Sequence, residues 1–138
     1  MNKTILKKYA HLIAKVGANV QKGQDVTVVA NLDQELLVKY IVEDCYKLGA
    51  RLVNVDWESD MVSKVQYKKA TVTALSDFPA WKEEKQKHIN KTLPCMIYIE
   101  SSDPDALKGV NQSKVAKIRR NLIAHIKPYR DERDNKYQ

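Results

Sequence analysis

The feature that most constrains the fold is an apolar β-branched run, Val26–Ala30, that is followed by a helical pattern and a second strand pattern. Such a run is typical of a strand that is buried on both faces of a sheet. Apolar residues then recur at helical spacing from Leu36 to Leu48, Gly49 stops that helix, and Arg51–Asp56 has a strand pattern. A strand, a helix and a strand in this order predict a βαβ unit with parallel strands and a right-handed crossover.

A further amphipathic helix is predicted before this unit. Asn2 or Thr4 is placed to cap its start and Gly17 to end it, and a turn at Gly23 separates it from the first strand. Its predicted core-facing residues are Ile5, Leu6, Tyr9, Leu12, Ile13 and Val16. The first strand leads into the next helix through Asn31–Asp33, where Asn31 or Asp33 is the expected cap.

The second half of the chain has weaker patterns. The predicted elements are a helix over Ser59–Tyr67 with Met61, Val62 and Val65 turned inward, a short helix over Thr71–Leu75, a helix from Ser76–Pro79 to about Lys91, a strand over Pro94–Ile99, and a last helix. Asn111 or Ser113 is expected to cap the last helix, and Lys127–Pro128 is expected to end it. Its inward face is Val115, Ile118, Leu122 and Ile126.

These elements predict an α/β fold. We expect a three-layer domain with a mainly parallel sheet of at least three strands and helices on both faces. A chain of 138 residues is long enough for one domain with a full core.

The net charge of +7 raises nucleic acid as a partner. The charge is concentrated at the end of the chain, because residues 114–138 hold eight lysines and arginines but only three acidic residues. No apolar run approaches the roughly 18 residues of a membrane span, and no signal-peptide pattern opens the chain, so a cytoplasmic location is expected. Cys45 and Cys95 are expected to be buried small hydrophobes.

The loops after the strands are the expected places for ligand-binding or catalytic residues, because open α/β sheets bind ligands there. The loop Ala30–Asp33 has no glycine, which excludes a dinucleotide fingerprint or a P-loop. The loop Asp56–Asp60 has three carboxylates, which could hold a metal or act as acid and base; helix capping in a solvated loop is the alternative. The loop Ser101–Asp105 could bind a substrate amine or form a capped turn.

Nucleophilic and metal catalysis are poorly supported. The three histidines, His11, His88 and His125, are scattered, have no catalytic or metal-binding motif around them, and are expected to be ordinary surface or boundary residues. Trp57, Phe78 and Trp81 are expected in the core or at its rim. The sequence therefore assigns no catalytic, cofactor-binding or metal-binding residue.

Several stretches in order along the chain resemble the N-terminal domain of one metallopeptidase family, the aminopeptidase T, aminopeptidase S and PepS group. They are Leu6–Ala10, Val16–Gln24, Tyr46–Ala50 with Val55–Trp57, Phe78–Lys82, Ser101–Asp105, Leu107–Val110 and Lys127–Arg130. Each stretch alone is weak, but the ordered set covers essentially the whole chain.

The resemblance implies a cytoplasmic, dimeric exopeptidase that removes N-terminal residues from peptides with two divalent metal ions, such as cobalt, zinc or magnesium. Family members are roughly three times longer, and their metal ligands lie in a C-terminal catalytic domain that has no counterpart here. Residues 1–128 would then be a non-catalytic N-terminal domain, and residues 129–138 would begin the connection to the missing domain. The alternative is a small independent module that binds nucleic acid or acidic protein with its basic last helix; no membrane role is expected.

Overall fold

The computed structural model describes residues 2–101 and 103–137. It divides the chain into two compact units. The first comprises residues 1–59 and 94–103, and the second comprises residues 60–93 and 104–138.

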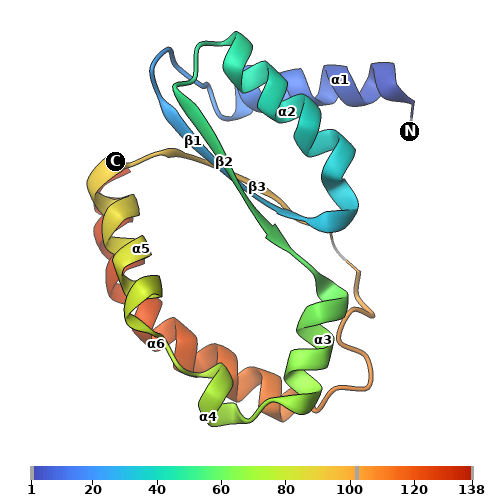
Figure 1. Cartoon of the computed structure of the whole chain (residues 1–138), viewed down its shortest axis with the longest axis vertical. Helices are drawn as coiled ribbons and strands as arrows, with labels where there is room; N and C mark the ends of the chain where they lie inside the picture. The colour runs from blue at the N-terminus through green and yellow to red at the C-terminus, as the bar shows by residue number, and fades with distance from the viewer. Residues whose placement is uncertain (1, 102, 138) are drawn as a thin grey trace. The chain divides into compact units, whose positions relative to one another are not determined.

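The first unit is built on a parallel three-stranded sheet (Figure 1). Its elements are α1 (Lys3–Leu12), the π-helical turn η1 (Ile13–Gly17), β1 (Asp25–Asn31), the 3-10 turn η2 (Leu32–Gln34), α2 (Glu35–Lys47), β2 (Leu52–Glu58) and β3 (Cys95–Ile99). The strand order is β2-β1-β3, and both pairings are parallel, with Val28 opposite Val55 and Ile97. The predicted α/β class, the βαβ unit and the parallel sheet are confirmed.

The core of this unit lies between the sheet and the pair of helices α1 and α2. The central strand contributes Val26, Val28 and Ala30, and α2 contributes Leu37, Val38, Tyr40, Ile41 and Cys45. The turn before β1 and the end of α2 meet, since the N–H of Gly23 donates to the carbonyl of Gly49 at 2.7 Å. Both glycines have positive φ, 79° and 99°, as the turn predictions require.

Helix α1 buries only part of the face that the sequence predicts. Leu6 and Ile13 pack against the core beside the fully buried Ala10 and Ala14, whereas the other four predicted residues are exposed. These four are Ile5, Tyr9, Leu12 and Val16. The two alanines explain why a different side of α1 faces the core than the sequence predicts. Their small side chains let α1 approach α2 closely on the side where they lie.

The second unit consists of helices. They are α3 (Asp60–Lys69), α4 (Val72–Leu75), α5 (Ala80–Thr92) and α6 (Gln112–Tyr137), and α5 and α6 lie side by side (Figure 1). Of the predicted inward face of α6, Val115 and Ile118 are buried, whereas Leu122 and Ile126 are only partly buried. Ile89 of α5 is also buried. The prediction that α3 turns its apolar residues inward is wrong, because Met61, Val62 and Val65 are exposed. No side chain of the described residues packs over them closely enough to bury them.

The prediction that the last helix ends at Lys127–Pro128 is wrong, because α6 continues through Pro128 to Tyr137. A proline inside a helix removes the hydrogen bond to the carbonyl four residues earlier. Here the residues after the proline bond extensively to α5, and these tertiary contacts offset the lost backbone bond. Among the described residues, no helix, α6 included, is both long and apolar enough to cross a lipid bilayer.

Candidate functional site

The carboxyl end of the parallel sheet is the first place to look for a site. The chain leaves the central strand β1 toward β2 on one side and later returns to β3 on the other. Such a divergence creates a topological switch point at the carboxyl ends of β1 and β3, where open α/β sheets bind ligands.

Three polar side chains meet at this switch point. The Asn31 amide nitrogen donates to the carbonyl oxygen of Ser101 at 3.2 Å, and the Ser101 hydroxyl donates to Asp33 Oδ2 at 2.6 Å. The predicted capping roles of Asn31 and Asp33 are therefore wrong. Neither side chain caps η2 or α2, because both bond to the loop after β3 instead.

These bonds join the two loops and occupy the polar groups that catalysis would need. The proton of Ser101 is directed at a carboxylate that belongs to the same cluster, and none of the three histidines is on either loop. The predicted loop over Ser101–Asp105 includes Ser102, which lies outside the described residues. The arrangement acts as a fastening between the loops after β1 and β3.

The acidic run Asp56–Asp60 is divided between two elements. Asp56 and Glu58 belong to β2 and, two positions apart, point to the same face of the strand, while Asp60 is in the first turn of α3. A carboxylate in a first turn interacts favourably with the helix dipole, which fits the capping alternative. Across residues 2–101 and 103–137, no group of three or more histidine, cysteine, aspartate or glutamate side chains could hold a metal ion.

The histidines lie on three different helices and are exposed, as predicted. His11 Nδ1 is 3.7 Å from Asp44 Oδ2, and the His125 ring stacks on Phe78 with 5.5 Å between the ring centroids. The partners of His11 and His125 are side chains of neighbouring elements, and neither arrangement brings a second histidine or a nucleophile to the ring.

Neither cysteine is a reactive nucleophile. Burial, with smaller contributions from Cys95 and Asp44, raises the pKa of the Cys45 thiol to about 11. Burial also raises the pKa of Cys95, whose Sγ lies 3.6 Å from the carbonyl oxygen of Ala18. Both thiols are protonated at neutral pH, and a thiol reacts as its thiolate. The prediction that the cysteines are buried small hydrophobes is confirmed for Cys45, whereas Cys95 is only partly buried against the core.

The first unit has two surface hollows along α2. One, of about 560 Å³, lies between α1 and α2 and is lined by side chains of both charge signs. Two of its side chains already have partners, since Lys7 lies over the Tyr40 ring, 5.4 Å from its centroid, and His11 faces Asp44. The other, of about 480 Å³, lies beside β2 and has Leu36, Val55 and Trp57 in its wall.

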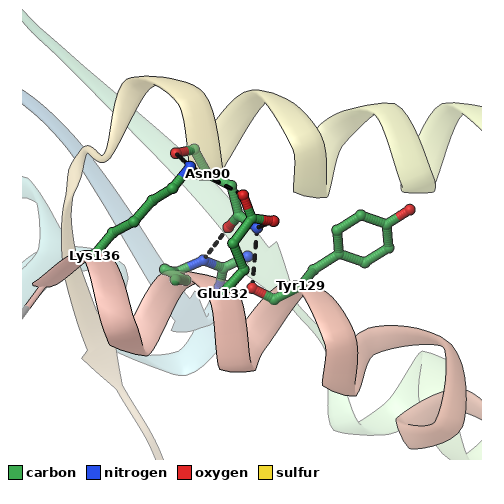
Figure 2. A network of polar contacts seen from close by, with 5 residues as sticks. Asn90, Tyr129, Glu132 and Lys136 are labelled. Carbon is green, nitrogen blue, oxygen red and sulfur yellow. Dashed lines mark hydrogen bonds and ion pairs between the residues drawn. The ribbon is translucent and has the colours of Figure 1, made fainter.

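The most connected polar cluster joins α5 to α6 around Asn90 (Figure 2). The Asn90 amide nitrogen donates to the carbonyl oxygen of Tyr129 and to Glu132 Oε2, each at 3.0 Å. Its Oδ1 accepts from Arg133 Nε at 3.0 Å, and its backbone carbonyl accepts from Lys136 Nζ at 2.9 Å. Asn90 is only 3% exposed, and both ends of its amide are satisfied. The cluster is closed on itself and serves as a clamp between two helices.

The clamp shifts the pKa of two groups. A hydrogen bond from the Tyr129 hydroxyl to Glu83 Oε1, 2.5 Å long, is the main reason that the pKa of Tyr129 is raised to about 12. Hydrogen bonds from Lys136 and from Asn90 lower the pKa of Glu132. The Tyr129 shift follows from a bond between α6 and α5, and the Glu132 shift follows mainly from Lys136 on the same helix, so neither shift needs a ligand.

This clamp was not predicted from the sequence, because the last helix was expected to end at Lys127–Pro128. A signal was present in two pairs at i, i+4 spacing, Lys127 with Asp131 and Glu132 with Lys136, which support a helix. The structure shows both pairs, at 2.6 Å and 3.0 Å.

The clamp also uses part of the basic charge of α6. Lys136 and Arg133 bond to α5, and Lys114 Nζ donates to the carbonyl oxygen of Ala70 at 2.6 Å. The cations of α6 that make no hydrogen bond or ion pair with any described residue include Lys117, Arg119 and Arg120. The positive surface available to a nucleic acid is therefore smaller than the sequence indicates.

Comparisons with known proteins agree on one family. Residues 2–137 match the family described as thermophilic metalloprotease (M29). The chain is 36% identical over 125 residues to aminopeptidase AmpS of Bacillus subtilis, which covers 91% of this chain and 30% of the relative. It is 30% identical over 123 residues to aminopeptidase PepS of Streptococcus thermophilus, which covers 89% of this chain and 30% of the relative.

A solved structure gives the same result. Wild-type AmpT from Thermus thermophilus superposes with a TM-score of 0.84 at 28% identity, covering 94% of this chain and 33% of that one. The chain spans about 30% of the length of the curated relatives that it matches, which corresponds to an N-terminal domain. With a match across nearly all of its residues, the chain belongs to the thermophilic metalloprotease (M29) family.

Proposed function

We propose that this chain is the non-catalytic N-terminal domain of a metal-dependent aminopeptidase, an enzyme that removes N-terminal residues from peptides. The observation that carries the proposal is the family match over residues 2–137 combined with coverage of only about 30% of each relative. The relatives are named aminopeptidases, so the remaining part of such an enzyme is where the chemistry is expected.

The donor groups of this chain do not fit the divalent metal ions that the family name implies. The carboxylates of Asp56 and Glu58 lie on a strand, Asp60 opens a helix, and the histidines belong to other helices. Among the described residues they form no cluster of metal ligands. We therefore place the metals, whether cobalt, zinc or magnesium, outside this chain.

The role that remains for the chain is to support the catalytic part and to shape or cover its substrate cavity. The bonds at the switch point support this role, since Ser101, Asn31 and Asp33 fasten two loops at the position where a ligand would otherwise enter. We also propose a cytoplasmic location, a homodimer for the whole enzyme, and a connection to the catalytic part through residues 129–138.

Two activity measurements test the proposal. The purified chain is expected to release no leucine from a leucyl peptide with added Co²⁺, Zn²⁺ or Mg²⁺, while full-length Bacillus subtilis AmpS serves as the positive control. A chimera in which this chain replaces the matching segment of AmpS is expected to be active. Metal-dependent release of leucine by the chain alone would refute the non-catalytic role. A folded but inactive chimera would refute the equivalence of the two domains.

The alternative function, binding of nucleic acid or acidic protein by α6, has a separate test. Lys117, Arg119 and Arg120 are exposed and would have to provide the phosphate contacts. Binding of random duplex at low micromolar protein, with a salt slope that falls when these three residues are changed to alanine, would favour this alternative. We expect no such binding.

A further inference from the structure

An exposed apolar stripe runs along α1 and into η1. It consists of Ile5, Tyr9, Leu12 and Val16, whose side chains are 51%, 51%, 54% and 69% exposed. Their spacing of four, three and four residues places them in a line on one side of the helix. We call these four residues the α1 stripe.

The stripe is unusual because α1 already has a buried side. Ala10 and Ala14 are fully buried toward α2, and Leu6 and Ile13 pack on the same core. A helix with one buried face normally places polar residues on the rest of its surface. A continuous line of four large apolar residues beside the buried face is typical of a second contact surface.

The charges around the stripe indicate the character of its partner. Lys8 follows Ile5 by three positions and Lys15 follows Leu12 by three, so both lysines border the stripe on one side. Across the described residues, neither lysine forms an ion pair or a hydrogen bond. The first 24 residues contain five lysines and no acidic residue, so the charge that α1 itself places beside the stripe is positive. The acidic residues nearby, Glu43 and Asp44, belong to α2 and line the hollow between the two helices. A partner surface with an apolar centre and an acidic border would complement it.

We infer that the α1 stripe docks the part of an M29 aminopeptidase that lies outside this chain, on an apolar surface bordered by aspartate or glutamate. The inference rests on the proposed function. The matched relatives have about 70% of their length beyond the segment that this chain covers, which provides a protein surface of sufficient size. The stripe is buried in the whole enzyme and exposed only when this domain stands alone.

Two other occupants fit the observations less well. A second copy that paired stripe to stripe would bring Lys8 and Lys15 close to the same lysines of the other copy, and like charges across an interface are unfavourable. An anionic bilayer would attract the lysines, but a helix that lies in a membrane buries a broad apolar face. Here the rest of the apolar face, including Ala10 and Ala14, is already used against α2.

The chimera with Bacillus subtilis AmpS provides the test, with thermal stability as the readout. Leu12→Ser and Tyr9→Ser are each made in the chimera and in the isolated chain, and Met61→Ser on α3, also an exposed apolar residue, is the matched control. In the isolated chain, none of the three is expected to shift the unfolding midpoint appreciably, because each side chain is exposed. In the chimera, both stripe variants are expected to lower the midpoint by at least about 2 °C, while Met61→Ser leaves it unchanged.

A charge variant tests the border of the stripe. Lys8→Glu with Lys15→Glu is expected to lower the midpoint of the chimera, and the loss is expected to shrink at high salt because salt screens the interaction. If the stripe variants lower the unfolding midpoint of the chimera no more than Met61→Ser does, the inference is overturned. If the AmpS chimera does not fold, PepS of Streptococcus thermophilus provides a second acceptor for the same variants.

Measurements on the isolated chain address the other occupants. Self-association that Leu12→Ser abolishes would assign the stripe to a second copy, and binding to vesicles rich in phosphatidylserine that Leu12→Ser abolishes would assign it to a membrane. Either result overturns the inference. A chimera that is inactive but shows the predicted midpoint losses would refute the proposed catalytic equivalence and still support docking, so the two failures are distinguishable.

Discussion

Removal of the Asn90 side chain is expected to loosen α5 from α6. In Asn90→Ala, the carbonyl of Tyr129 and Nε of Arg133 lose their bonds to the amide. A hydrogen bond contributes about 0.5–1.5 kcal/mol net, and a donor left without an acceptor in a half-buried position adds about 1 kcal/mol. The bond to Glu132 receives no weight, since that carboxylate is solvated. We expect the free energy of unfolding to fall by about 2–4 kcal/mol.

The assay is urea unfolding followed by far-UV circular dichroism at neutral pH. Lys87→Ala is the control, because exposed Lys87 bonds among the described residues only to Glu84 on the same helix, at 3.4 Å. Its loss is expected to stay within about 0.5 kcal/mol. Asn90→Asp keeps the acceptor for Arg133 but presents a carboxylate to Glu132, so it is expected to be nearly as destabilising as Asn90→Ala. The reasoning fails if Asn90→Ala costs no more than Lys87→Ala.

Three further predictions concern protonation and backbone geometry. The folded state raises the pKa of Tyr129 from 10.0 to about 12. The hydroxyl therefore contributes its full stabilisation below pH 10 and loses it as the pH rises through 12, and Tyr129→Phe should remove this part of the pH dependence of urea unfolding. The Cys45 pKa of about 11, against 9.0 for a free thiol, lowers the thiolate fraction about a hundredfold, so a thiol reagent at pH 8 should label Cys45 only after unfolding; labelling at the rate of a free thiol would contradict this. Gly49→Ala should destabilise more than Gly23→Ala in thermal unfolding, since both have positive φ but an added Cβ meets Lys22 atoms at 3.0–3.2 Å only at position 49; equal losses would show that the contact relaxes.

The sheet could be predicted from the sequence because its signals are local and redundant. The β-branched run at Val26–Ala30 is typical of a strand, and Gly23 and Gly49 fix the turns that precede β1 and β2. Parallel pairing then follows from the helix between the strands, since a crossover connection requires it. The same reasoning predicted part of the buried face of α6, where Val115 and Ile118 are buried as their spacing indicates.

The end of α6 and the roles of the polar loop residues could not be predicted in this way. A local rule ends a helix near Pro128, but the helix continues because Asn90 of α5 bonds to the residues that follow the proline. Asn90 is 39 positions from Tyr129, so the local sequence around Pro128 gives no signal of this bond. A local rule also makes Asn31 and Asp33 caps, but Ser101, 70 and 68 positions away, takes both side chains. Propensity describes what a segment can do alone, and tertiary bonds of about 1 kcal/mol each are enough to change the outcome.

The burial of the apolar face of α1 was predicted incorrectly for a different reason. Periodicity predicts which residues avoid water, but it does not specify whether the surface that covers them belongs to the same domain. Leu6 and Leu12 carry the same signal, yet Leu6 packs on the core and Leu12 is exposed. On the proposal that this chain is one domain of a longer enzyme, part of its apolar periodicity encodes contacts with the rest of that enzyme. The α1 stripe, where an otherwise successful pattern meets solvent, therefore indicates where the catalytic part should be sought.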